Sequence, residues 1–103
     1  PEDHLKSMVK EFNLRRKLIV DGLRSIKGIE CSMPGGSFFV FPNISKTGMN
    51  GEEFTEKCLD KADVAMIPGT AFGKFATDNV RLNFATSREN ISKAIEKIDK
   101  ILK

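Results

Sequence analysis

Residues 80–84 read VRLNF, in which apolar and polar side chains alternate without a break. Successive side chains of an extended strand point to opposite faces, so this pattern predicts a strand with one apolar face. Val80, Leu82 and Phe84 would pack into a core on that face. Arg81 would then point to the other side of the sheet.

The segment after this strand predicts the clearest helix of the chain. Thr86 or Ser87 can begin its first turn, and Glu89 can complete a capping box with Thr86. Apolar residues then recur every three or four positions, as they do on the buried side of an amphipathic helix. They are Ile91, Ala94, Ile95, Ile98, Ile101 and Leu102.

A second helix is predicted to run from the loop before residue 51 through Ala62. Asn50 and Glu53 are three positions apart and form a capping pair at its start. Three apolar residues are expected to form its buried side. They are Phe54, Cys58 and Leu59.

Three further short segments complete the predicted sheet. Residues 64–67 read VAMI and end at a proline–glycine pair, and residues 38–41 read FFVF, which is too aromatic and β-branched for anything but a strand. Residues 29–33 are expected to join residues 38–41 through a turn or a bulged hairpin. FFVF is apolar on both faces, whereas a small sheet with helices on one side should be polar on the other. We expect another part of a larger protein to cover the second face, unless these are scattered exposed aromatics on an edge strand.

A long amphipathic helix is predicted from Glu2 to Ile26, with Gly28 ending it. Its apolar positions follow the three-and-four spacing. They are Leu5, Met8, Val9, Phe12, Ile19, Leu23 and Ile26. The complete order α-β-β-α-β-β-α predicts an α+β fold, with helices packed on one face of a small, largely antiparallel sheet of three to four strands.

Composition indicates one compact domain, residues 1–103, with ordinary globular values of 40% apolar and 30% charged residues. No run is apolar enough for a membrane span.

Two cysteines in different contexts and a single histidine argue against a metal site or Cys/His catalysis. The formal charge of +3 is mild, and the basic run at residues 15–17 is interpreted as a solvated helix face. The chain begins without a Met or an apolar leader, so we expect a piece of a longer cytoplasmic protein.

Three motifs resemble those of other functional classes, but each lacks a feature that the function requires. PGTAFGK, residues 68–74, is one residue short of a phosphate-binding loop, and its glycines are expected to serve a turn with positive φ. Lys46 follows a serine but lies in a polar loop, which is unsuited to a Schiff base. GSFFVF, residues 36–41, overlaps the aromatic strand of RNA-recognition modules. A ferredoxin-like nucleic-acid-binding module is therefore the alternative, although the basic residue at the head of that pattern is missing.

Three segments resemble the C-terminal small domain of fold-type I aminotransferases, which depend on pyridoxal 5'-phosphate (PLP) and include aspartate aminotransferase. They are PGGSFFVFP at residues 34–42, VAMIPGTAFG at 64–73 and VRLNFATS at 80–87. The leading helix, with RRKLIVDGL at residues 15–23, is similar too. The resemblance therefore covers essentially the whole chain.

The resemblance implies two substrate-binding residues. The family's arginine at the place of Arg81 binds the α-carboxylate of the substrate, and the aromatic residue at Phe38 lies in the hairpin that lines the substrate pocket. A rigid, two-pronged guanidinium on a strand suits carboxylate recognition.

The same resemblance implies what this chain lacks. The family's Schiff-base lysine, its other cofactor-binding residues and a ring-contacting tyrosine belong to a large PLP-binding domain, and this chain has no tyrosine. We therefore expect no catalytic, cofactor-binding or metal-binding residues here and no activity of the chain alone. The implied partners are the large domain and an amino-acid or 2-oxo-acid substrate, with aspartate as the family-level expectation. The parent is expected to be a cytoplasmic homodimer that binds neither nucleic acid nor membrane.

Overall fold

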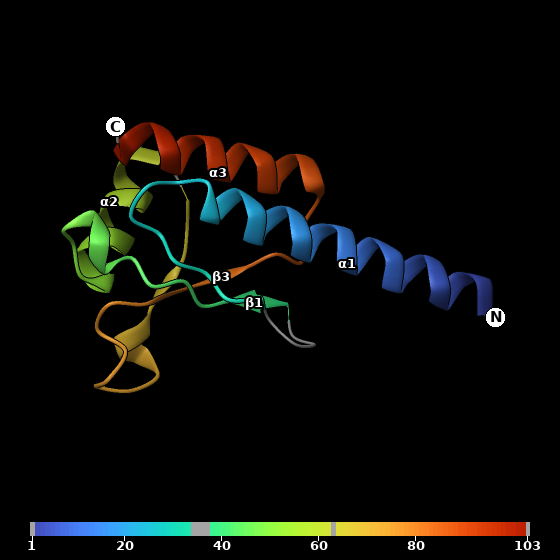
Figure 1. Ribbon diagram of the computed structural model, residues 1–103, viewed down its shortest axis with the longest axis horizontal. Helices are drawn as coiled ribbons and strands as arrows, with labels where there is room; N and C mark the ends of the chain where they lie inside the picture. Colours follow the sequence, from blue (N-terminus) through green and yellow to red (C-terminus); the bar gives the residue numbers. More distant parts are fainter. Residues whose placement is uncertain (1, 34–37, 63, 103) are drawn as a thin grey trace.

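The computed structural model describes residues 2–33, 38–62 and 64–102, and it confirms the predicted α+β class. Three helices are interleaved along the chain with three short strands, which pair into a small sheet (Figure 1). The helices are α1 (Glu2–Arg24), α2 (Gly51–Ala62) and α3 (Arg88–Leu102); the strands are β1 (Phe39–Val40), β2 (Ile67–Pro68) and β3 (Val80–Asn83); two short 3-10 turns are η1 (Ser45–Thr47) and η2 (Gly69–Ala71).

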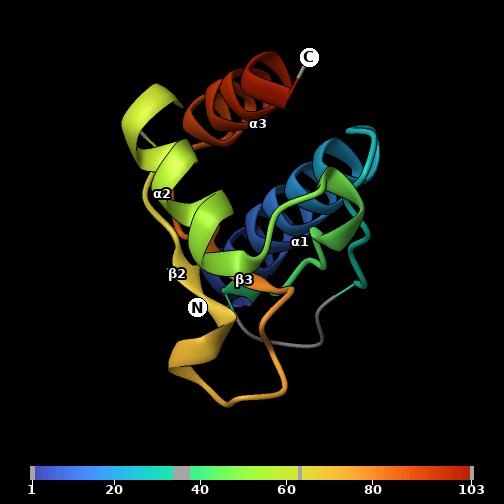
Figure 2. The same ribbon diagram turned by 90° about the vertical axis from the view of Figure 1, so that its left-hand side faces the viewer.

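The sheet has the strand order β1-β3-β2, and both strand pairs are antiparallel. Val40 lies opposite Leu82, and Ile67 lies opposite Arg81. Figure 2 shows the three helices on one side of the strands and the segment at residues 69–79 extending to the other side. The helices therefore cover one face, as predicted. The central strand is β3, which comes last of the three in the sequence.

Alternation along β3 is confirmed. Val80, Leu82 and Phe84 are buried against the helices, while Arg81 points to the opposite face and is only half-buried. The core beneath them is completed by apolar residues of all three helices. They include Ile19, Val20 and Leu23 of α1, Phe54 and Cys58 of α2, and Ile91 and Ile98 of α3.

Helix α1 begins at Glu2 as predicted and ends at Arg24, two residues before the predicted end, and it packs against the core only from Phe12 onward. Leu5, Met8 and Val9 satisfy the helical spacing and yet are exposed. Figure 1 shows the reason, because the N-terminal half of α1 extends beyond the rest of the chain. The turn after α1 contains Gly28 with φ of 95°, the left-handed conformation expected where a helix ends.

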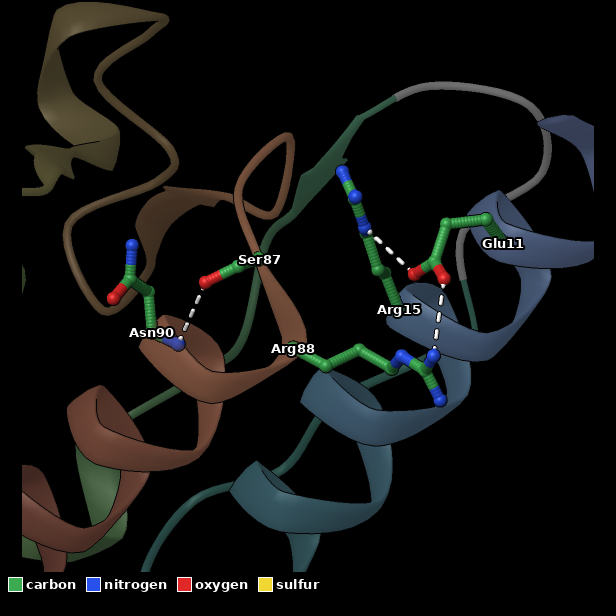
Figure 3. Close-up of polar contacts among 5 residues, drawn as sticks. All are labelled: Glu11, Arg15, Ser87, Arg88 and Asn90. Carbon is green, nitrogen blue, oxygen red and sulfur yellow. Dashed lines mark hydrogen bonds and ion pairs between the residues drawn. The ribbon is translucent and has the colours of Figure 1, made fainter.

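An ion-pair cluster joins α1 to the start of α3 (Figure 3). One oxygen of the Glu11 carboxylate lies 2.9 Å from Arg15 Nε, and the other lies 3.2 Å from Arg88 Nη2. Such partly exposed pairs stabilise a fold by about 1 kcal/mol at most. Arg15 and Arg16 are only partly exposed and Lys17 is exposed, so residues 15–17 lie on the helix surface but are not the fully solvated face that the sequence predicted.

Both predicted helix starts are close to the observed ones. Asn50 and Glu53 form a reciprocal capping box, in which each backbone N–H donates to the other side chain at 3.1 and 2.9 Å. At α3 the cap is Ser87, whose hydroxyl accepts from the Asn90 N–H at 3.1 Å. The predicted box between Thr86 and Glu89 is wrong, because the Thr86 hydroxyl accepts from the Asn90 amide instead.

Three local predictions are corrected by the structure. Leu59 is exposed, because the buried stripe of α2 follows an i, i+4, i+8 spacing through Cys58 to Ala62. Residues 64–66 are not in a strand, and β2 begins only at Ile67. Residues 29–33 form a single bridge, between Glu30 and Asn43. Beyond this bridge, the Phe41 carbonyl accepts a hydrogen bond from the Asn79 side-chain amide at 3.2 Å.

Candidate functional site

Arg81 lies on the central strand and faces away from the helices. Its guanidinium carbon is over the Phe39 ring, 4.1 Å from the ring centroid, and over the Phe72 ring at 4.6 Å. Within the described part of the chain, no acceptor bonds its N–H groups and no carboxylate lies within ion-pair distance. A guanidinium presents five donors in a plane, so this arrangement leaves those donors for a ligand.

The two rings reach Arg81 from either side of β3. Phe39 belongs to β1, and its backbone partner on β3 is Asn83, two residues from Arg81 on the same face. Phe72 follows β2 and η2, at the start of the segment that extends below the sheet (Figure 2). Phe72 also meets the Phe41 ring edge-on, with 6.1 Å between centroids.

Backbone hydrogen bonds hold the segment that carries Phe72. The Gly69 N–H donates to the Asn79 carbonyl at 2.7 Å, and the Phe72 N–H donates to the Gly69 carbonyl at 2.8 Å. A Cβ at Gly69 would lie 2.3 Å from the Ala76 carbonyl oxygen. Gly69 therefore permits a close backbone approach and has no positive φ, whereas Gly73, the other glycine of this motif, has the expected positive φ, at 158°.

The structure does not bring Phe38 and Arg81 together. Phe38 lies on the helical side of β1, where its ring is 4.9 Å from that of Phe12 and 6.0 Å from that of Phe84. Its side chain is nevertheless 47% exposed at the edge of this cluster. The predicted substrate contact of Phe38 stays a prediction.

Phe39 and Phe72 were not identified from the sequence as site residues. Phe39 could have been found, because a period of two places it on the face opposite Phe38 and Val40. Phe72 carried no such signal. Its contact with Arg81 depends on the path of an irregular segment.

Other reactive groups in the described residues show no features of a catalytic site. Lys46 pairs with Glu30, and this hydrogen bond together with the carboxylate charge raises the pKa of Lys46, the opposite of what a Schiff-base lysine needs. Burial raises the pKa of Cys31, and raises that of Cys58 to about 11. Among the residues that the structure describes, no cluster of metal-ligating side chains occurs. None of the described helices has both the length and the apolar composition needed to span a membrane.

Comparison with known proteins matches residues 1–98 to the family described as aminotransferase class I and II. An aspartate aminotransferase of Pyrococcus horikoshii is 48% identical over 98 residues, which are 95% of this chain and 25% of that protein. An aromatic-amino-acid aminotransferase of Thermococcus litoralis is 34% identical, over 96% of this chain and 25% of that protein. The chain thus spans about a quarter of the length of the curated relatives it matches.

Solved structures agree with this match. The aspartate aminotransferase of Rhizobium meliloti has a TM-score of 0.91 and 31% identity, over 99% of this chain and 28% of that chain. An aromatic aminotransferase of Pyrococcus horikoshii has a TM-score of 0.90 and 37% identity, over 97% of this chain and 26% of that chain. These matches do not support the alternative of a nucleic-acid-binding module. The chain belongs to the class I and II aminotransferase family.

Proposed function

We propose that this chain is the C-terminal, substrate-binding small domain of a PLP-dependent aminotransferase, and that Arg81 binds the α-carboxylate of the substrate. The parent enzyme would transfer an amino group between an amino acid and a 2-oxo acid. Aspartate is favoured as the amino acid, because the relative with 48% identity is named an aspartate aminotransferase. The observation that carries the proposal is the half-buried Arg81 guanidinium, which lies against two aromatic rings and has no acid partner among the described residues.

Carboxylate binding suits the chemistry of this group. A guanidinium can donate two parallel N–H bonds to the two oxygens of one carboxylate, which fixes the orientation of the bound molecule as well as its charge. The aromatic surroundings exclude part of the water that would otherwise weaken this interaction. Arg81 would therefore orient every amino-acid and 2-oxo-acid substrate by the group that they all share.

The described residues do not fit PLP itself. Holding this cofactor as a Schiff base requires a lysine whose pKa is lowered by burial or by neighbouring cations. All the described lysines are exposed, and Lys46 has a raised pKa. We assign the cofactor to the large domain of the parent, and we expect the isolated chain neither to bind PLP specifically nor to transaminate. A stable aldimine absorbance together with turnover by the isolated chain would contradict this assignment.

The test of the proposed function is Arg81→Ala in the full-length parent enzyme. Loss of one partner of a desolvated, two-pronged charge pair costs about 2 to 5 kcal/mol, which corresponds to a loss of roughly 30-fold to several thousand-fold in kcat/KM. Arg81→Lys should restore only part of this loss, since one ammonium group cannot replace the planar fork. Steady-state kinetics measure both variants.

Arg88→Ala is the matched control. Arg88 is also an arginine of this domain, but its guanidinium pairs with Glu11 at the junction of α1 and α3. We expect Arg88→Ala to keep near-normal kcat/KM. Near-normal kinetics of Arg81→Ala, with cofactor absorbance and fold intact, would exclude the proposed function of Arg81.

A further inference from the structure

We propose that Phe39 and Phe72 are positioning residues, which hold the Arg81 guanidinium in the orientation that receives a carboxylate. This inference rests on the proposed function of Arg81. The guanidinium carbon lies 4.1 Å from the Phe39 centroid and 4.6 Å from the Phe72 centroid, over both rings. Attraction between a cation and an aromatic face fixes the position of the guanidinium without using its N–H donors.

An arginine side chain has many rotamers, and ordering it upon binding would reduce affinity. Proteins commonly fix such a side chain with an acid, as Glu11 fixes Arg88 in this chain. An acid beside Arg81 would occupy the donors and compete with the substrate carboxylate. Two rings against the guanidinium instead order it and leave its charge uncompensated.

The two rings are themselves held in place. Phe39 is on a strand whose register with β3 is set by the pairing of Val40 with Leu82. Phe72 is fixed by the backbone bond from its N–H to the Gly69 carbonyl and by its edge-on contact with Phe41. Their contacts with Arg81 therefore come from a supported framework, which is what a positioning role requires.

The experiment is a double-mutant cycle in the full-length parent enzyme, with Phe72→Leu, Arg81→Ala and the double variant. The probe is maleate, a dicarboxylate that has no amino group to transfer, and its Kd is measured by calorimetry alongside KM and kcat for the amino-acid substrate. We expect Phe72→Leu to raise Kd and KM roughly 3- to 30-fold, with a smaller change in kcat. Phe72→Tyr, which keeps an aromatic face, should restore most of the affinity.

The decisive comparison is made in the Arg81→Ala background. If Phe72 acts through Arg81, Phe72→Leu has no further effect there, so the two changes are strongly non-additive. Additive losses, or a Phe72→Leu enzyme with wild-type Kd and KM, would overturn the inference. Wild-type values for Arg81→Ala would instead overturn the proposed function, so the two failures are distinguishable.

Phe75→Leu is the matched control, and Phe39→Leu is the second variant. Phe75 lies in the same segment as Phe72 but is fully exposed, at 101%, and makes no ring contact with Arg81. Its substitution should be additive with Arg81→Ala. If Phe72→Leu does not fold, the same cycle with Phe39→Leu tests the same prediction, because Phe39 makes the shorter contact with Arg81.

Discussion

Two arginines of this domain illustrate how position determines the use of one functional group. Arg88 is at the first turn of α3, where its charge is balanced by Glu11 and contributes to the contact between two helices. Arg81 is on the central strand, and its guanidinium lies over two aromatic rings and has no acid partner within the described residues. The first guanidinium is satisfied inside the fold, whereas the second keeps its hydrogen-bonding capacity.

Cys58 provides a prediction at the scale of a single residue. Its side chain is fully buried in the core, and burial raises its pKa to about 11. At pH 8 such a thiol is about 0.1% thiolate, compared with roughly a quarter for a free cysteine. We therefore expect Cys58 in the folded chain to react with a thiol reagent at least about 100-fold more slowly than in the denatured chain.

The pH dependence of this reaction has a definite sign. Because the pKa is raised, the thiolate fraction in the folded chain should still increase between about pH 9 and pH 11, whereas in denaturant it should level off above about pH 9. Mass spectrometry after timed labelling distinguishes Cys58 from Cys31. Rapid labelling of Cys58 at pH 8 in the folded chain would contradict the burial described here.

At this scale the sequence predicted the direction of Arg81 but not its neighbours. The direction follows from the strict period of two between Val80 and Phe84, which is a local property. The contact between Arg81 and Phe72 depends on the conformation of an irregular segment, held by the Gly69 and Asn79 backbones. No pattern within a few residues encodes such an arrangement.

The start of α2 provides a prediction at the scale of an element. Asn50 accepts a hydrogen bond from the Glu53 N–H, one of the donors that a helix leaves unpaired at its N-terminus. Asn50→Ala should lower the free energy of unfolding by about 1 kcal/mol, while Asn50→Asp keeps the acceptor and should be close to wild type. Urea denaturation of the chain measures both, and equal stability of the three proteins would show that the cap contributes nothing.

Helices were predicted more accurately than strands in this chain, for a physical reason. The extent of α1 and the cap of α2 follow from local spacing and from side chains three positions apart. Strand lengths depend on hydrogen bonds to distant partners. Residues 29–33 were expected to pair with residues 38–41, but the described part of this segment forms a single bridge, between Glu30 and Asn43.

Exposed apolar side chains lead to a prediction for the whole molecule. Leu5 and Val9 of α1 are 61% and 58% exposed, and Phe41, Ile67 and Phe72 are exposed on the sheet face away from the helices. Apolar surface of this extent favours association. We expect the isolated chain to self-associate, and we expect Leu5→Glu with Val9→Glu to shift it toward the monomer in sedimentation velocity.

Leu59→Glu is the control for this experiment. Leu59 is 56% exposed, which is comparable to Leu5. Unlike Leu5, it is a single exposed apolar residue among the charged residues of α2. Its substitution should leave the association unchanged. A monomeric wild-type chain at high concentration would contradict the prediction, and would indicate that these side chains tolerate water.

The sequence predicted the class of the whole molecule well, because three helical patterns and alternating strands leave few possible arrangements. It did not predict that Leu5, Met8 and Val9 would be exposed, although their spacing matched that of Ile19 and Leu23. Periodicity shows that one side of a helix is apolar. It does not show where along the helix a partner lies.

The projecting half of α1 has a mechanical consequence. From Glu11 onward the helix contacts α3 and the core, whereas residues 2–10 extend past the body of the chain, a length of about 14 Å at the helical rise (Figure 1). A straight helix that is fixed at one end moves as a rigid rod. A rotation of the packed part by about 5° moves the free tip by about 1 Å, given the helical rise per residue. Small tilts of the body that carries Arg81 would thus be magnified at the far end of this rod.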